Sequence, residues 1–202
     1  MHKTTFNKMN WFKENYLNTD EKLSILDVGS LDNSGDNYNY GSIFNSPKWD
    51  YTGLDFVNGP NVDIVVDDIY NWMEIPDNSY DVVISGQLFE HLGFFWLTMG
   101  EIDRVLKPGG FCCIIAPSGG PKHGADTDCY RFQEGGMEFL AKYVDFKVLH
   151  ISTNNSEEAK PWCDTCLVAR KSGILTSESA NLEQKINNLE NKMNILINNI
   201  NK

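Results

Sequence analysis

The stretch Leu23-Ser-Ile-Leu-Asp-Val-Gly-Ser30 is an apolar run with a glycine directly behind it, as expected for a buried strand that ends in a turn. Further along, Tyr51-Thr-Gly-Leu-Asp55 repeats the pattern and ends in an acid. A nucleoside ligand needs such a pair, because glycine lets the backbone approach closely and a carboxylate at the next strand's tip accepts both ribose hydroxyls. The two stretches therefore predict an α/β domain that binds a nucleoside cofactor.

The composition limits the classes of partner. The chain has 202 residues and a net charge of −11, which is enough for one domain with a full core and an appendage. This acidity repels phosphate backbones and anionic lipids, so we expect neither nucleic acid nor membrane as a partner. No apolar run approaches the roughly 20 residues of a membrane helix, and no signal region follows Met1. We expect a cytoplasmic protein.

The five cysteines do not suggest a disulfide framework. Cys112 and Cys113 lie in an apolar stretch, where cysteine behaves as a small hydrophobe. Cys163-Asp-Thr-Cys166 has the spacing of zinc ligands, but no second Cys or His pair accompanies it. We therefore expect a late strand of a reduced protein there, and no metal.

Apolar periodicity predicts the elements. Residues 5–18 carry Phe6, Met9, Phe12 and Tyr16 at helical spacing. Strands are predicted at 23–28, 50–55, 62–66, 80–85, 110–116, 145–151 and 162–169, and further helices at 88–106 and 134–143. Several strands are apolar throughout, as in parallel sheets covered on both faces. The pattern predicts an α/β fold: a Rossmann-like, mostly parallel seven-stranded sheet with helices on both faces.

The C-terminal tail follows a different pattern. Its apolar residues alternate steps of four and three, at Leu182, Ile186, Leu189, Met193, Leu196 and Ile200. Such steps define a coiled-coil seam, and an isolated helix of this length is marginal in water. We expect a domain at 1–171 with an N-terminal helix in 1–18, a linker at 172–179, and a coiled-coil tail at 180–202. The tail favours a homo-oligomer, with packing on its own domain as the alternative.

The first turn argues against a dinucleotide. Leu31 stands where the dinucleotide fingerprint has its second glycine, and Asp27 and Asp32 would repel a pyrophosphate. A cationic ligand without phosphates fits this charge better.

At this point the chain resembles a known family, the class I S-adenosylmethionine-dependent methyltransferases, close to their small type 11 group, over roughly residues 20–170. The motifs that carry the resemblance stand in the family's order: Ile25-Leu-Asp-Val-Gly-Ser30, Asp55, Val65-Val-Asp-Asp-Ile69, Ser79 to His91, and Arg104-Val-Leu-Lys-Pro-Gly-Gly-Phe111. The last of these is the most specific match. Leu31, in place of a usual glycine, departs from the family pattern in the methionine pocket.

The resemblance implies S-adenosyl-L-methionine as the cofactor and assigns it residues. It implies contacts to the methionine portion from Asp27, Gly29 and Ser30, to the ribose from Asp55, and to the adenine from Asp67, Asp68 and Ile69. Gln87 is a further candidate for a cofactor contact, because it stands where the C-terminal end of a strand would meet the cofactor. Each acid also has a plainer interpretation as a turn cap or a solvated strand end. Three acids at three successive strand ends favour a shared ligand.

The acceptor side is less defined by sequence. Methyl transfer is a direct displacement, so a base is needed only where the acceptor loses a proton. His123, in the loop after the fifth strand of the motif order, and His91 are the candidate catalytic residues. Tyr130, Arg131 and Trp96 are candidates for substrate binding, with an ion pair of Arg131 to Asp126 or Asp128 as the structural alternative.

We therefore expect methyl transfer from S-adenosylmethionine to a small polar acceptor, with a sugar hydroxyl in glycan biosynthesis as the guess for the substrate. A non-catalytic scaffold of the same fold, assembled through the tail, is the alternative. A nicotinamide-dependent oxidoreductase is disfavoured by the acidic first turn.

Overall fold

The computed structural model describes residues 3–32, 39–123 and 127–173. The predicted tail at 180–202, and the linker apart from Ser172 and Gly173, lie outside these residues, so the coiled coil and the homo-oligomer stay predictions. Within the described ranges, no helix is long and apolar enough to cross a membrane.

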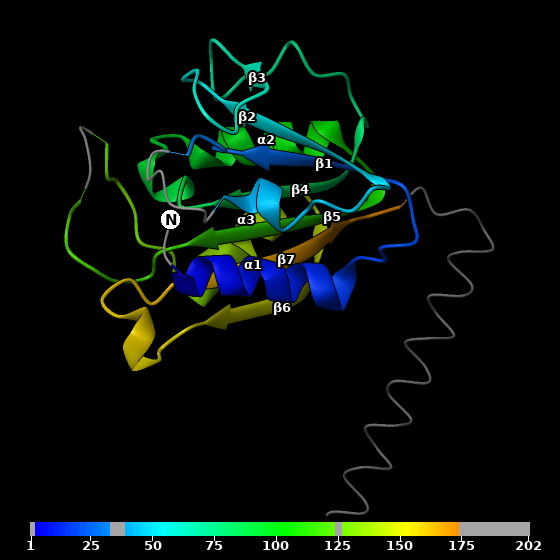
Figure 1. The fold of residues 1–202 in the computed structure, drawn as a ribbon. Coiled ribbons are helices and arrows are strands. Elements are labelled where there is room, and N and C mark those ends of the chain that lie inside the picture. Colours follow the sequence, from blue (N-terminus) through cyan, green and yellow to red (C-terminus); the bar gives the residue numbers. More distant parts are fainter. Residues whose placement is uncertain (1–2, 33–38, 124–126, 174–202) are drawn as a thin grey trace, which may run out of the picture. The chain divides into compact units, whose positions relative to one another are not determined.

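A seven-stranded sheet forms the centre of the fold (Figure 1). Its strands are β1 (Leu23–Val28), β2 (Trp49–Asp55), β3 (Ile64–Val65), β4 (Tyr80–Gly86), β5 (Leu106–Ala116), β6 (Phe146–Thr153) and β7 (Thr165–Lys171), in the order β3-β2-β1-β4-β5-β7-β6. The first five strands run parallel, but β7 is antiparallel to both β5 and β6. The sheet is therefore mixed. The connection from β6 to β7 is too short for a crossover helix, so β7 returns antiparallel.

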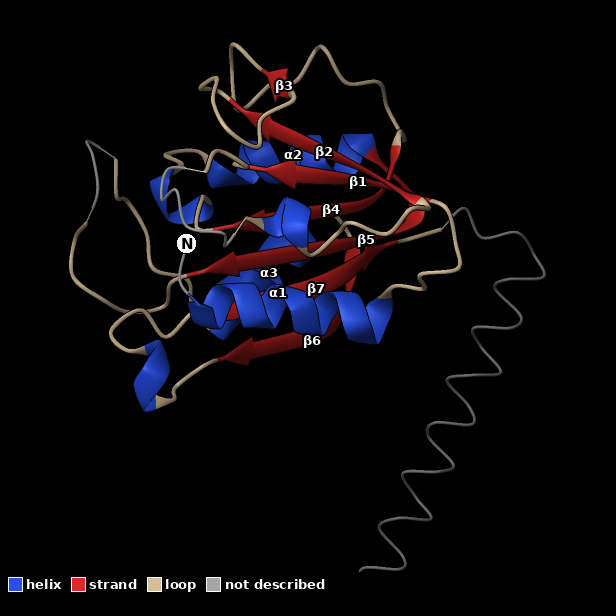
Figure 2. Cartoon of the chain, in the orientation of Figure 1, coloured by secondary structure: helices blue, strands red, loops and turns tan. Residues whose placement is uncertain are grey.

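Helices cover both faces of the sheet, as predicted (Figure 2). Helix α1 (Lys3–Tyr16) lies on one face, while α2 (Phe95–Val105) and α3 (Glu134–Tyr143) lie on the other. Alternate residues of each central strand serve the two layers: Ile25 packs with α1, whereas its neighbour Leu26 packs in the α2 and α3 layer.

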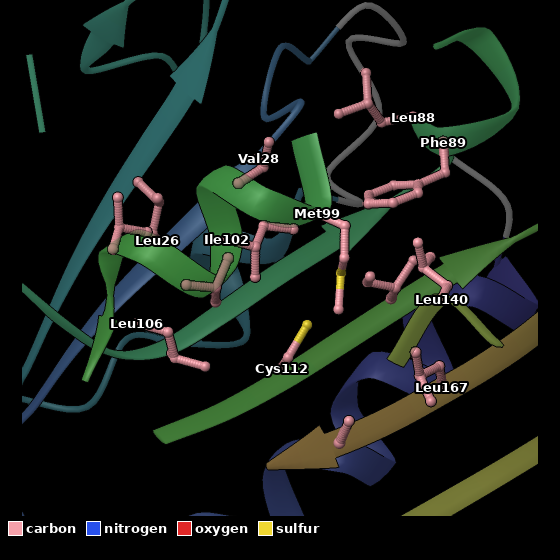
Figure 3. Close-up of a cluster of buried hydrophobic side chains, with 14 of the residues drawn as sticks. Leu26, Val28, Leu88, Phe89, Met99, Ile102, Leu106, Cys112, Leu140 and Leu167 are labelled. Atoms are coloured by element: carbon pink, nitrogen blue, oxygen red, sulfur yellow. The ribbon is translucent and has the colours of Figure 1, made fainter. Parts of the chain in front are cut away.

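The larger core lies under α2 and α3 (Figure 3). Met99 and Ile102 of α2 and Leu140 of α3 pack there against Cys112 of β5 and Leu167 of β7, all buried. Cys112 is an ordinary apolar member of this core, as the sequence predicts.

The helix predicted over 88–106 is wrong in its first turn. A 3₁₀ turn at Phe89–His91 is followed by a break, and α2 begins only at Phe95. A continuous helix would need the Glu90 carbonyl for the amide four residues on. That carbonyl instead accepts hydrogen bonds from the Cys129 and Tyr130 amides, at 2.7 and 3.2 Å. A tertiary contact has taken the acceptor that the helix requires.

The strand predicted to start at residue 110 begins earlier, at Leu106. Lys107-Pro-Gly-Gly110 does follow the end of α2, but it enters the sheet as an irregular strand start, with a register shift against Tyr80 and Val82. Gly109 has φ +80°, which L side chains rarely adopt. The glycine therefore permits a bulge within the strand rather than a free turn.

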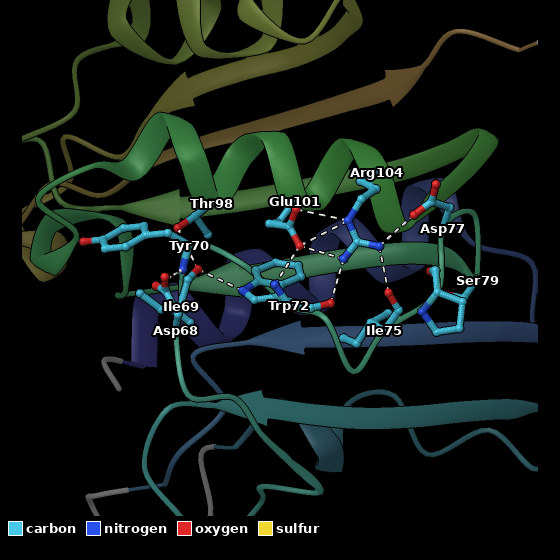
Figure 4. Close-up of polar contacts among 11 residues, drawn as sticks. Asp68, Ile69, Tyr70, Trp72, Ile75, Asp77, Ser79, Thr98, Glu101 and Arg104 are labelled. Carbon is cyan, nitrogen blue, oxygen red and sulfur yellow. Dashed lines mark hydrogen bonds and ion pairs between the residues drawn. The ribbon is translucent and has the colours of Figure 1, made fainter.

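Arg104 of the family-like motif holds the segment before β4 onto α2 (Figure 4). Its guanidinium donates to Glu101 and Asp77 and to the carbonyls of Trp72 and Ile75. Trp72 itself is fully buried, and its amide donates to Glu101. The most specific sequence motif therefore serves folding, through a residue whose planar fork a lysine could not reproduce.

Candidate functional site

The carboxyl ends of β1, β2, β4 and β5 meet at one edge of the sheet. The chain proceeds from β1 to β2 on one side and later returns to place β4 on the other side of β1. The strand order thus switches direction between β1 and β4, and open α/β sheets bind ligands at such a point. The predicted cofactor residues that follow β1, β2 and β4 all lie along this edge.

Gly29 makes the turn after β1. Its φ is +82°, and a Cβ at this position would lie 2.9 Å from the side chain of Leu88. The amides of Gly29 and Ser30 donate to the Leu54 carbonyl, which ties the turn to β2. The hydroxyl of Ser30 is buried and has no hydrogen-bond partner within the described structure. The turn therefore needs a glycine, and it leaves one buried hydroxyl available to a ligand.

Asp55 ends β2 beside this turn and is 5% exposed. One carboxylate oxygen accepts from the Leu31 amide at 3.1 Å, and the other accepts from the Val57 amide at 3.0 Å. Two backbone amides fix the carboxylate, and each oxygen keeps a lone pair for a further donor. This arrangement suits a pair of ribose hydroxyls.

Asp27 of β1 is 2% exposed and accepts a hydrogen bond from the Tyr51 hydroxyl at 2.6 Å. Its second oxygen, Oδ1, has no partner among the described residues. Burial raises the pKa of Asp27 to about 7; the Tyr51 hydrogen bond opposes this rise, and the charge of Asp55 adds to it. A cationic group bound at Oδ1 would favour the ionised form.

Replacing Asp27 by Asn is expected to reduce the pH dependence of stability. An aspartate with a pKa near 4 when unfolded and about 7 when folded holds its proton more tightly in the folded state. The contribution of this carboxyl to the free energy of unfolding is therefore complete below about pH 4 and is lost as the pH rises through about 7. Asn keeps an acceptor for Tyr51 but carries no charge.

The measurement is urea unfolding at pH 5 and pH 8. From pH 5 to pH 8, the free energy of unfolding of the wild-type protein should fall by about 2 to 3 kcal/mol more than that of the variant. Contributions from other titrating groups cancel in the comparison. Equal losses in both proteins would show that the Asp27 carboxyl is not perturbed in this way.

The segment assigned to adenine lies on the β3 side of the same edge. Asp67 and Asp68 are exposed, and an Asp68 oxygen accepts from the Tyr70 amide at 2.9 Å. Ile69 packs against the core, and its carbonyl accepts from the Trp72 indole and the Thr98 hydroxyl (Figure 4). Asp68 thus shapes the turn, while the Asp67 carboxylate is accessible to solvent.

Gln87 follows β4 with φ +60°. Its side-chain amide donates to Asp164 at 2.9 Å, and Asp164 also accepts from the Thr5 hydroxyl of α1 at 2.7 Å. The structure therefore directs this amide to the start of β7 and to α1. Its predicted contact with the cofactor stays a prediction.

Glu90 and the two candidate histidines lie together beyond β4. Glu90 is fully buried, neither of its carboxylate oxygens has a hydrogen-bond partner among the described residues, and burial raises its pKa to about 8. The His91 and His123 rings have centroids 5.3 Å apart, and the His123 ring lies 4.3 Å from that of Trp162. The structure thus brings together two histidines that are far apart in sequence.

The three residues predicted for the substrate have structural contacts. The Tyr130 hydroxyl donates to the Gly93 carbonyl at 3.0 Å. Arg131 forms a two-pronged ion pair with Asp128, which holds the pKa of that carboxyl well below its usual range. Trp96 is 37% exposed, with its ring edge-on to that of Phe95. The ion-pair alternative for Arg131 is present with Asp128; Asp126 lies outside the described residues.

The Cys163 and Cys166 pair is not part of a metal-binding group among the described residues. Cys166 lies in β7, buried with its sulfur 4.0 Å from that of Cys113. The carbonyl of Cys163 accepts from the Ser118 hydroxyl. This pair contributes to packing and to loop structure.

Some residues at the site were not assigned from sequence. Glu90, in the stretch from Ser79 to His91 that resembles the family, received no predicted role; an acid directly after the apolar pair Leu88 and Phe89 is the signal that could have found it. Phe56, directly after Asp55, is 55% exposed at a position where an apolar side chain would normally be covered. Tyr51 and its contact with Asp27 depend on strand register, which the sequence alone does not provide.

Comparison with known proteins agrees with this geometry. A family model described as a methyltransferase domain, of type 11, matches residues 44–114. No curated protein matches the chain by sequence.

Solved structures with this fold are similar at low identity. An S-adenosylmethionine-dependent methyltransferase from Methanosarcina mazei has a TM-score of 0.58 at 15% identity, over 79% of this chain and 96% of that chain. The 1,6-didemethyltoxoflavin-N1-methyltransferase of Burkholderia thailandensis, solved with S-adenosylhomocysteine, gives 0.63 at 15% identity, over 83% of this chain and 78% of that chain. The [4+2]-cyclase SpnF has a TM-score of 0.61 at 18% identity, over 83% of this chain and 81% of that chain.

The family match covers the strands from β2 to most of β5, and the fold, the glycine turn and the strand-end acids extend the agreement to β1. The chain therefore has the fold of these S-adenosylmethionine-dependent methyltransferases, and its residues 44–114 are similar to the methyltransferase domain model.

Proposed function

We propose that this domain transfers the methyl group of S-adenosylmethionine to an oxygen of a small polar acceptor, with a sugar hydroxyl as the first class to test. The observation that supports it is the placement of two groups of polar residues along one edge of the sheet, on either side of the end of β1. Asp55 belongs to the cofactor side, and the Glu90–His91–His123 group forms the acceptor side. The two sides adjoin, because the Leu88 side chain, two residues before Glu90, lies directly against Gly29.

The cofactor would lie across the ends of β1 and β2. Asp55 would accept from both ribose hydroxyls, and the buried Ser30 hydroxyl and Asp27 Oδ1 would contact the methionine portion, as polar groups without partners in the described structure. The exposed Phe56 offers an apolar surface for the adenine ring, and Asp67 an acceptor for its amine. We retain Asp68 and Ile69 as the turn that shapes this edge.

The acceptor would bind beside the two histidines. Phe94 and Trp96, 54% and 37% exposed, offer flat apolar surfaces directly after the His91 turn, suited to the less polar face of a ring. His123 would orient or deprotonate the hydroxyl, since imidazole is an effective base near neutral pH. We assign Tyr130 and Arg131 to positioning of the loop, because their polar groups are occupied by protein partners.

The test is a methyl-transfer assay of the full chain with monosaccharides and nucleotide sugars, read by release of S-adenosylhomocysteine. With an active acceptor, His123→Ala should lower turnover about 100-fold or more, while the affinity for S-adenosylhomocysteine stays within about twofold.

His150→Ala is the matched control, because His150 contacts Lys8 and Ser152 on the α1 face. The control should keep wild-type turnover. Loss of cofactor binding in His123→Ala, or unchanged turnover, would contradict the division into a cofactor side and an acceptor side.

A further inference from the structure

Two possible metal-ligand atoms, one from Glu90 and one from His91, face each other in the buried group beyond β4. Glu90 is fully buried and neither carboxylate oxygen has a hydrogen-bond partner among the described residues, yet Oε1 lies 3.7 Å from Nε2 of His91. The other ring nitrogen of His91 contacts the Thr127 carbonyl. A carbonyl only accepts, so Nδ1 donates to it, and the other ring nitrogen, Nε2, is the one that faces the carboxylate. A metal ion between them would give both atoms a partner.

His123 provides the third donor. Its ring approaches that of His91, and its Nδ1 is buried without a hydrogen-bond partner in the described structure. The nearby Asp128 carboxylate lies 3.4 Å from this nitrogen and is held in place by Arg131. One ligand atom from each of Glu90, His91 and His123 lies within 4.8 Å of the others. Among the described residues this is the one such group of His, Cys, Asp and Glu.

We propose that Glu90, His91 and His123 bind a divalent transition-metal ion, with Zn²⁺ as the type case, that holds the acceptor oxygen for methyl transfer. The inference rests on the proposed function for its chemistry and differs from the sequence-based expectation of no metal. Two imidazoles and one carboxylate form a ligand set that leaves a position open for substrate. The contact of His91 with a backbone carbonyl is the outer-shell bond that orients metal-ligating histidines.

The spacing fits such a site after a small adjustment. Ligands about 2.1 Å from a tetrahedral zinc ion are about 3.4 Å apart, whereas the three ligand atoms lie within 4.8 Å of one another, so the most distant pair must converge by at most about 1.4 Å. Side-chain rotation of the two partly exposed histidines can provide this. The carboxylate of the buried Glu90, which has no hydrogen-bond partner among the described residues, would then gain a bond to the metal.

The metal would act on the acceptor. A hydroxyl bound in the open position would become more acidic. As a metal ligand, His123 would orient this hydroxyl through the metal and would not deprotonate it, so the proton passes to solvent water. The metal-held oxygen then attacks the methyl carbon of the sulfonium. A carbon–oxygen bond forms while the carbon–sulfur bond breaks, and the electron pair of that bond remains on sulfur, giving S-adenosylhomocysteine and the methyl ether.

The test is metal titration of the full chain, first treated with EDTA. Calorimetry with Zn²⁺ should show one ion per chain at micromolar affinity or better. Co²⁺ should give the visible absorption of a four- or five-coordinate site without thiolate charge-transfer bands, because no cysteine is a ligand. Glu90→Gln and His123→Ala should each weaken Zn²⁺ binding 10-fold or more, while His150→Ala should match the wild type.

Titration with S-adenosylhomocysteine in the same samples separates this inference from the proposed function. Glu90→Gln nearly preserves side-chain shape, and both variants should bind the cofactor product as the wild type does, which also shows that they are folded. A wild-type protein that binds the cofactor product but no Zn²⁺ or Co²⁺ would overturn the metal site and leave the proposed function standing. Metal binding unchanged in both variants, or thiolate bands with Co²⁺, would overturn the assignment of the ligands.

Discussion

Asp55→Ala should lower the affinity for S-adenosylhomocysteine about 100- to 1,000-fold. Each charge-assisted hydrogen bond to the carboxylate is worth about 1.5 to 3 kcal/mol, and two ribose hydroxyls would be left without their acceptor. The carboxylate is held for this purpose by the Leu31 and Val57 amides, so no rearrangement is needed when the cofactor binds. Calorimetric titration of the purified proteins measures the effect.

Asp50→Ala is the matched control for this experiment. Asp50 lies in the same strand, β2, near its opposite end and is exposed, so its removal deletes the same charge far from the strand tips. The control should bind within about twofold of the wild type. If Asp55→Ala is folded and binds as tightly as the control, the ribose does not lie at the tip of β2.

The sequence was most informative where one local rule decided the structure. β1 has the predicted bounds, 23–28, and α3 has the predicted bounds, 134–143. β1 is a short apolar segment with a clear end, and α3 carries its buried residues Met137, Leu140 and Ala141 at helical spacing. The acids at the ends of β1 and β2 could also be predicted, because parallel strands bring their carboxyl ends to one edge.

The errors arose where a distant contact overrode local preference. The helix beginning at 88 was not formed because the Glu90 carbonyl bonds to amides about 40 residues later in the chain. The place of β7 between β5 and β6, antiparallel to both, agrees with the predicted mostly parallel sheet, but the strand composition does not reveal it. The meeting of His91 and His123 is likewise a property of the tertiary fold.

The role of a residue was harder to predict from the sequence than its place in the fold. Gln87 is near the predicted edge, but its amide donates to Asp164, and Arg131 is near the acceptor side, but its fork is occupied by Asp128. A sequence motif identifies which residue stands at a position, whereas a role depends on which neighbour takes its hydrogen bonds. For the same reason, the unpaired Glu90 became visible only in the structure.

Gly53→Ala should destabilise the protein by about 3 kcal/mol or more. Gly53 lies in the middle of β2, opposite Asp27 of β1. A Cβ there would lie 2.0 Å from the backbone carbonyl oxygen of Asn61 and 2.6 Å from the Ser30 hydroxyl. Backbone cannot rotate away as a side-chain end can, so the chain at Asn61 must move, and overpacking of this kind commonly costs 1 to 3 kcal/mol or somewhat more.

The displacement should also reach the cofactor side. The Asn61 amide donates to the Ser30 carbonyl and to the Tyr51 hydroxyl, and Tyr51 in turn donates to Asp27. Moving Asn61 therefore disturbs the turn after β1 and the support of Asp27 together. We expect Gly53→Ala to weaken binding of S-adenosylhomocysteine about 10-fold or more even at temperatures where the variant is folded.

Gly100→Ala is the matched control, since it makes the same substitution in α2 with no atom within 4 Å of the new Cβ. In a helix interior, alanine is more favourable than glycine by about 0.5 to 1 kcal/mol, so this variant should be more stable than the wild type. Chemical denaturation of the wild type and the two variants measures the expected loss of stability in Gly53→Ala and the expected gain in Gly100→Ala. Equal unfolding midpoints for Gly53→Ala and the wild type would mean that β2 and the Asn61 turn are not in close contact, and that the support of Asp27 must come from elsewhere.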